Sequence, residues 1–174
     1  MGAQRADNNS ASAGSVEDLV GFGIAVVREE GRWQCTPLTG GVLTSLRTAE
    51  KELLELRSSG AVFGLLDVDE EFFVIVRPAP TGTRLLISDA TAAIDYDIAA
   101  DVLDLLRVEP PDEEDTELWP EGDLGVLADL GMPSHELQII VDEVDLYPDE
   151  QLQMIAQRIG FIDEFTKLLD TIQA

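Results

Sequence analysis

The sequence contains very little of the chemistry on which enzymes most often depend, with one histidine and one cysteine in 174 residues. Nucleophilic catalysis by serine or cysteine usually needs a histidine base, and zinc sites draw on clusters of Cys and His. No glycine-rich phosphate loop is present, since Gly21-Phe22-Gly23 lacks the third glycine and opens a strand pattern instead of a helix. The sequence therefore predicts a binding protein, with no catalytic residue, metal ligand or cofactor site.

Long apolar runs are also missing. No stretch approaches eighteen consecutive apolar residues, which excludes a transmembrane helix. The first fifteen residues contain no apolar core of a secretory signal, Ala6 breaks the myristoylation pattern, and we expect residues 1–15 to be a disordered tail. Cys35 has no second cysteine with which to pair, so these features together predict a cytoplasmic protein.

Basic side chains are scarce and unevenly placed: 11 Lys and Arg stand against 35 Asp and Glu, a formal charge of −24. Residues 1–60 carry 8 acids and 6 bases, a net −2, whereas residues 108–174 carry 18 acids and 2 bases, a net −16. Such a field repels phosphate backbones and anionic membranes and attracts basic surfaces. We therefore predict a basic protein partner, no direct nucleic-acid binding and no membrane binding. The alternative is that the charge serves only solubility.

The first part of the chain reads as a sheet with helices. Five strands are predicted between turn residues: Gly21–Arg28, Arg32–Pro37, Ala61–Val68, Phe72–Arg77 and Thr83–Ser88. Two helices are predicted from apolar stripes, the first at Val42, Leu46, Ala49, Leu53 and Leu56, the second at Ile98, Val102, Leu105 and Leu106, ending near Arg107. The order ββαβββα predicts an α+β domain over residues 16–107, with a mainly antiparallel five-stranded sheet. The near-continuous apolar runs favour central strands covered on both faces.

The composition changes after this domain. Glu109–Glu117 has six acids and two prolines in nine residues, so residues 108–120 are predicted to be an acidic loop or linker. Residues 121–174 are predicted to be a helical part packed on the sheet domain. A short helix is expected at Leu124–Leu130, the next with Ser134 as its N-cap, another with Pro148 as its first residue, and a last amphipathic helix from Phe161.

Two kinds of surface feature are candidates for function. The carboxylates of the acidic loop and the aromatic residue after it are predicted to bind a partner: Asp112, Glu113, Glu114, Asp115 and Trp119. Trp119 could equally seal the helical part onto the sheet, and Tyr147 is interpreted as a sealing residue. Carboxylates also gather at Asp67–Glu71 and Asp95–Asp101, where a divalent metal is conceivable, but with 35 acids in the chain a solvated turn is favoured.

Several blocks occur in an order that resembles a known family: GFGIAVVREEGRW, DEEFFVIVR, RLLISDATAA, LWPEGDLGVLADLGM and DLYPDEQLQMIAQRIGF. The set is similar to the tRNA adenosine deaminase-associated proteins of actinobacteria, over about residues 21–165. The family's name reflects an association with the gene of the enzyme that converts adenosine to inosine at the tRNA wobble position. The resemblance supplies no catalytic residues. Zinc-dependent base deaminases need H-x-E and P-C-x-x-C motifs, whereas His135 precedes Glu136 and Leu137, so this chain cannot be the deaminase.

Three functional hypotheses follow. In the first, a non-catalytic accessory protein binds the basic tRNA-gripping surface of the deaminase, either as a regulator or by competing with tRNA through its charge. In the second, a small acidic chaperone or adaptor serves another client. In the third, a carboxylate-dependent enzyme uses a divalent metal, which would make its melting temperature depend on Ca²⁺ or Mg²⁺.

Overall fold

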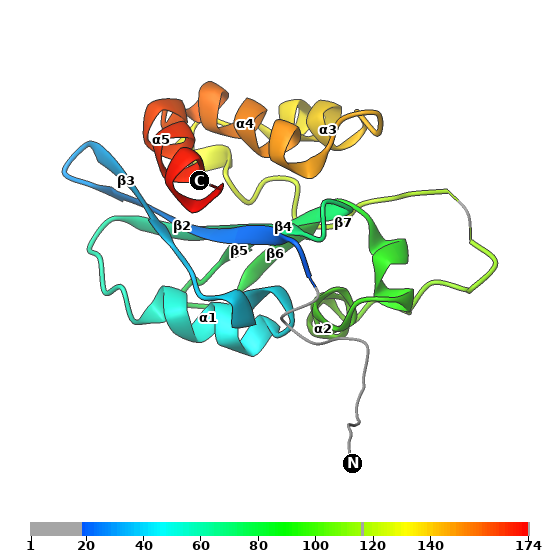
Figure 1. Cartoon of the computed structure of the whole chain (residues 1–174). Coiled ribbons are helices and arrows are strands. Elements are labelled where there is room, and N and C mark those ends of the chain that lie inside the picture. The colour runs from blue at the N-terminus through cyan, green and yellow to red at the C-terminus, as the bar shows by residue number, and fades with distance from the viewer. Residues whose placement is uncertain (1–18, 116, 174) are drawn as a thin grey trace, which may run out of the picture.

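The computed structural model describes residues 19–115 and 117–173, and shows an antiparallel sheet with helices on both faces (Figure 1). The α+β class is therefore confirmed. The tail predicted at residues 1–15 lies outside the described residues. Within the described residues, no helix is long and apolar enough to cross a membrane.

In the described part of the chain the sheet has six strands, with the spatial order β3-β2-β4-β5-β6-β7 and antiparallel pairing throughout. The five predicted strands are all present: β2 (Gly21–Glu29), β3 (Arg32–Pro37), β4 (Ala61–Val68), β5 (Phe72–Arg77) and β6 (Arg84–Ile87). As predicted, the apolar strands β4 and β5 lie in the centre of the sheet. Helices cover both of its faces, so these strands are buried on both sides.

The prediction of five strands was wrong by one. The sixth strand, β7 (Glu121–Gly122), pairs with β6 through Leu86 and Ile87 and begins the segment that was predicted to be helical. Two residues are too short to show the period of two from which a strand is read. Gly122 is required here, since it has a φ of 112° and a Cβ would lie 2.2 Å from the Leu85 carbonyl oxygen.

One face of the sheet is covered by α1 (Leu46–Leu54) and α2 (Asp97–Leu106), below the sheet in Figure 1. Two 3-10 turns, η2 (Gly40–Leu43) and η3 (Ala90–Ile94), precede these helices. Ser45 caps α1 by accepting a hydrogen bond from the Thr48 N–H, and Arg107 ends α2 in a left-handed conformation, where the sequence places its end. Alternate strand residues face these helices and form one apolar cluster.

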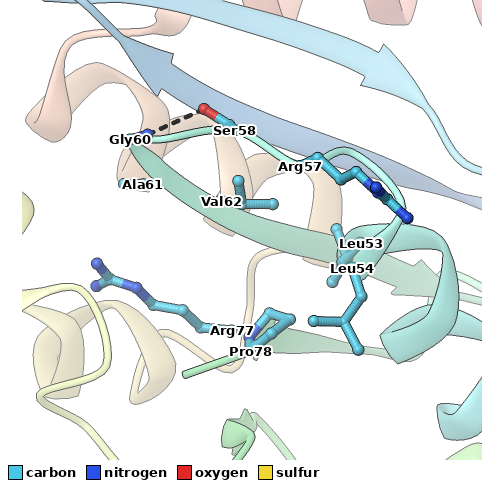
Figure 2. Close-up of a pocket in the computed structure, with 9 residues that line it drawn as sticks. All are labelled: Leu53, Leu54, Arg57, Ser58, Gly60, Ala61, Val62, Arg77 and Pro78. Carbon is cyan, nitrogen blue, oxygen red and sulfur yellow. Dashed lines mark hydrogen bonds between the residues drawn. The ribbon is translucent and has the colours of Figure 1, made fainter. Parts of the chain in front are cut away.

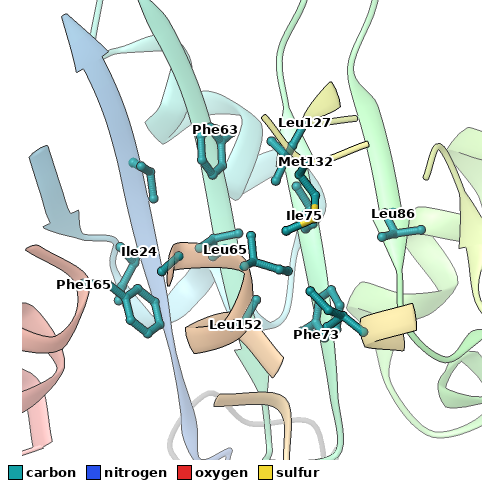
Figure 3. Packing of buried hydrophobic residues seen from close by; sticks show 14 of the residues in the cluster. Ile24, Phe63, Leu65, Phe73, Ile75, Leu86, Leu127, Met132, Leu152 and Phe165 are labelled. Carbon is teal, nitrogen blue, oxygen red and sulfur yellow. The ribbon is translucent and has the colours of Figure 1, made fainter. Parts of the chain in front are cut away.

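The opposite face is covered by α3 (Ser134–Val141), α4 (Pro148–Ile159) and α5 (Ile162–Gln173). Figure 3 shows Phe63, Leu65, Phe73 and Ile75 of the sheet packed beneath these helices. As predicted, Pro148 is the first residue of α4 and Gly160 ends the helix with a φ of 117°.

Two local predictions in this layer were wrong. Leu124–Leu130 is a series of turns in which only η4 (Ala128–Leu130) is helical, because Gly125 and the short apolar stretch do not sustain a longer helix. Pro133, rather than Ser134, is the N-cap of α3, and no side chain caps this helix. Pro133 holds an extended backbone, so the helix begins directly after it.

Candidate functional site: an acidic loop beside a small pocket

The acidic loop connects α2, which covers one face of the sheet, to β7, the strand at the edge of the sheet beside β6 (Figure 1). Its two ends are fixed by backbone hydrogen bonds, from the Val108 N–H to the Leu103 carbonyl and from the Ala90 N–H to the Trp119 carbonyl. The loop is therefore anchored at both ends.

The four predicted partner-binding carboxylates occupy a compact turn inside this loop. The Asp115 N–H donates to the Asp112 carbonyl at 2.9 Å, and the Asp112 N–H donates to Asp115 Oδ2 at 2.8 Å. All four side chains, of Asp112, Glu113, Glu114 and Asp115, are exposed. The structure thus brings four carboxylates together in a short, internally bonded turn that faces solvent.

Trp119 lies inward of this turn. Its side chain is half-buried and packs against the apolar cluster on the α1–α2 face, and its indole N–H donates to Glu121 Oε2 at 3.2 Å. The ring holds the end of the loop against the α1–α2 face of the sheet. The interpretation that Trp119 seals the helical part onto the sheet was therefore wrong, because α3, α4 and α5 cover the opposite face. The role of Trp119 in binding a partner stays a prediction.

The residues on either side of Trp119 form one wall of a pocket of about 240 Å³. Leu118 and Pro120 of the loop face Val144 and Leu146, which belong to the connection between α3 and α4. Further lining residues come from the β4–β5 turn, the end of β6, α3 and α4: Glu71, Ser88, Asp89, Val141, Asp142 and Gln151. This pocket thus gathers segments that are far apart in the sequence.

Apolar side chains remain exposed around this pocket. Leu118 is 53% exposed and Val144 is 61% exposed. The interpretation of Tyr147 as a sealing residue was wrong, since its side chain is 62% exposed. The surface therefore combines acidic groups with uncovered apolar groups, a composition that suits protein binding.

The carboxylates near Asp67 do not form one cluster. Asp67 is only 2% exposed and lies between Phe22 and Phe73 of the neighbouring strands, where burial raises its pKa to about 7. Asp69 instead accepts a hydrogen bond from the Tyr96 hydroxyl at 2.6 Å. Among the described residues, no group of three His, Cys, Asp or Glu side chains is arranged to hold a metal ion. The metal-dependent hypothesis thus gains no support from these carboxylates.

A second pocket, of about 310 Å³, lies at the end of α1 (Figure 2). The side chains of Arg57 and Arg77 point to different sides of it. Arg77 is already engaged, since it donates to both carboxylate oxygens of Asp129 and to the Val126 carbonyl. The guanidinium of Arg77 is therefore held by the η4 segment and is not free to bind a ligand in this pocket.

A family model described as "Rv3753c-like tRNA adenosine deaminase-associated protein" matches residues 21–162, which include both sheet faces and the whole acidic loop. The chain belongs to this family. It is also 60% identical to Protein Rv3753c of Mycobacterium tuberculosis (strain ATCC 25618 / H37Rv), over 99% of both chains. No solved structure matches it.

In this member of the family, the single histidine and the single cysteine lie on different elements. His135 is exposed in the first turn of α3, whereas Cys35 is half-buried in β3. Burial, with a further contribution from the charge of Glu164, raises the pKa of the Cys35 thiol to about 12. Replacing either residue with alanine should therefore leave partner binding unchanged.

The raised pKa gives a direct prediction for the Cys35 thiol. Because the thiolate is the reactive form, iodoacetamide should modify native Cys35 at least about a hundredfold more slowly than the cysteine of the unfolded chain at pH 8. Mass spectrometry of timed samples, with and without guanidinium chloride, measures both rates. Equal rates in the two conditions would show that this thiol is not protected.

Proposed function

We propose that this chain is a non-catalytic accessory protein that binds a basic protein partner, and that the partner is tRNA adenosine deaminase. The family description supports the association with a deaminase. The observation on which the proposal depends is the exposed turn Asp112–Asp115 next to the pocket. An enzyme that grips tRNA presents basic groups to phosphates, and this turn is their electrostatic complement.

The fold supports the same proposal by separating the charges in space. The −16 of residues 108–174 belongs to the loop and to the helical layer over one face of the sheet. A partner approaching this side meets few competing bases, because Arg158 and Lys167 are the two in this segment, and Arg158 is paired with Glu136. We propose that the loop and this layer together form the binding face.

Binding kinetics with purified tRNA adenosine deaminase test the proposal. Association should slow as salt rises, because the screening length falls to about 3 Å at 1 M. Changing Asp112 and Asp115 to Asn and Glu113 and Glu114 to Gln should slow association about tenfold at low salt and change dissociation little. A sensor surface bearing the deaminase, read at several salt concentrations, measures both rates.

A matched control removes four exposed charges outside the proposed face: Glu30→Gln, Glu55→Gln, Asp95→Asn and Asp104→Asn. This variant has the same net charge as the loop variant but should associate within about twofold of the wild type. Absence of binding at low salt would exclude the deaminase as the partner. Equal slowing of association in both variants would refute the role of the loop, because the net charge alone would then explain the effect.

Trp119→Ala gives a further comparison in the same assay. If the ring contributes to the interface, dissociation should become faster. Since the ring also packs against the sheet, the unfolding midpoint of the variant has to be measured alongside. Faster dissociation at temperatures where the variant stays folded supports the contact, whereas unchanged dissociation restricts Trp119 to packing.

A further inference from the structure

The described residues contain three buried polar side chains, Asp67, Ser88 and Gln151, and two of these line the pocket beside the acidic loop. Buried polar groups are normally hydrogen-bonded, since an unpaired one forfeits its bonds to water. Because both residues lie at one pocket, the partners of their polar atoms decide what this pocket can bind.

Each of them has an atom without a partner in the described part of the chain. The Gln151 amide donates to the Ile140 carbonyl at 2.9 Å and to the Glu143 carbonyl at 3.4 Å, which fixes its orientation. Its Oε1 accepts no hydrogen bond from the described residues. Ser88 Oγ accepts from the Phe73 N–H at 2.9 Å, and its own hydroxyl hydrogen has no acceptor there. The two buried side chains thus leave one acceptor and one donor without a partner at the pocket.

One acceptor and one donor complement the N–H and C=O of a peptide unit. The volume of about 240 Å³ lies below the roughly 300–1,000 Å³ of small-molecule and cofactor sites. It is of a size for one or two side chains of a protein segment. A short stretch of polypeptide fits this combination better than a cofactor does.

The rim indicates which stretch would be selected. Leu118 and Val144 present exposed apolar surface, which favours an apolar side chain. Glu71 and Asp142 stand exposed at the same opening, and no Lys or Arg lines the pocket. Basic residues beside the apolar one would complement these carboxylates, whereas acidic ones would be repelled.

We propose that this pocket binds a segment of the partner in which an apolar residue is flanked by Arg or Lys, with its backbone bonded to Gln151 Oε1 and the Ser88 hydroxyl. The inference rests on the proposed function, because it assigns a binding site for part of the same basic partner. The loop carboxylates then attract the partner, and the pocket retains it.

Capped peptides titrated into the ¹⁵N-labelled full chain test the site. The probe is Gly-Arg-Leu-Arg-Gly, and Gly-Arg-Ser-Arg-Gly and Gly-Glu-Leu-Glu-Gly are the comparisons. The probe should shift the resonances of the Gln151 side-chain amide and of the backbone at Leu118 and Val144. The two comparison peptides should bind at least about fivefold more weakly, because each removes one of the two complementary features.

Two pairs of variants locate the binding within the molecule. Val144→Ser should weaken the probe at least about fivefold, whereas Ile139→Ser, which changes a similarly exposed α3 residue outside the pocket, should not. Asp142→Asn should weaken it about twofold to fivefold, whereas Asp145→Asn, equal in charge and also exposed, should have less effect. Thermal unfolding of each variant checks that the fold is retained.

The outcomes separate this inference from the proposed function. Equal binding of the three peptides, or equal loss in Val144→Ser and Ile139→Ser, would overturn the pocket assignment even if the deaminase binds with the expected salt dependence. Pocket binding of the probe without deaminase binding would retain the site and refute the choice of partner.

Discussion

Asp67→Asn should make the protein more stable above neutral pH, and its advantage should shrink as the pH is lowered. Asp67 is buried between Phe22 and Phe73, and the desolvation raises its pKa from 3.8 to about 7. The nearby acids Asp149, Glu70 and Asp69 act in the same direction, while the hydrogen bond from the Glu70 N–H opposes it. The charged form of Asp67 is therefore poorly tolerated in the folded state.

The sign follows from where the proton is held. Between pH 3.8 and about 7 the folded protein keeps the Asp67 proton while the unfolded chain releases it. The contribution of Asp67 to the free energy of unfolding therefore falls as pH rises through this window and stays low above it. A tenfold change in a protonation equilibrium is worth about 1.4 kcal/mol. The gain of Asp67→Asn over the wild type should thus grow by on the order of 2–3 kcal/mol between pH 5 and pH 8.

Urea unfolding of both proteins at several pH values measures this difference. Asparagine preserves the acceptor for the Glu70 N–H, at 3.1 Å in the wild type, so the turn should be retained. Asp145→Asn serves as the control because Asp145 is exposed, and its effect should stay within about 0.5 kcal/mol at every pH. Parallel pH profiles for wild type and Asp67→Asn would contradict the prediction.

Phe161→Ala should lower the free energy of unfolding by about 3–5 kcal/mol. Phe161 is fully buried between α4 and α5, and its ring contacts Phe165 of α5, Phe63 of the sheet and Trp33 of β3. Its removal would leave a cavity where the helical layer meets the sheet. Because this layer and the sheet share one core, the variant should still unfold in a single, earlier transition.

The matched control is Tyr147→Ala, another aromatic truncation in the same layer. Tyr147 is largely exposed, so its replacement should cost less than about 0.5 kcal/mol. Circular dichroism and tryptophan fluorescence in urea give the two free energies from independent signals. Separate transitions for the two signals would instead mean that residues 121–174 unfold independently of the sheet domain.

The class of the fold was predictable because its strands are long and mostly apolar. Ala61–Val68 and Phe72–Arg77 are central strands with their expected bounds, and the turn residues between them mark a hairpin. β7 was not predictable, since its two residues form a strand only because they reach β6. Local sequence carries periodicity, but it does not carry the pairing of a short segment with a distant strand.

The candidate site was predictable in part. The acidic turn was found from composition alone, whereas the pocket beside it depends on segments that only the fold brings together. Two spacings in the sequence indicate buried polar residues that the sequence analysis did not identify. Asp67 follows Phe63 and Leu65 at a spacing of two, which places it on their buried face. Gln151 lies three residues after Pro148 and four before Ile155, on the buried stripe of α4.

The position of α5 has a consequence for the newly made chain. This helix, the last described element, packs on β3, which is among the first to be synthesised. Contacts between distant parts of a chain form late, and apolar surface exposed meanwhile is prone to aggregation. The sheet face that carries Phe22, Phe63 and Phe73 stays uncovered until the C-terminal helices leave the ribosome. Docking of α3, α4 and α5, rather than formation of the sheet, therefore ends the period in which this face can associate with the wrong surface.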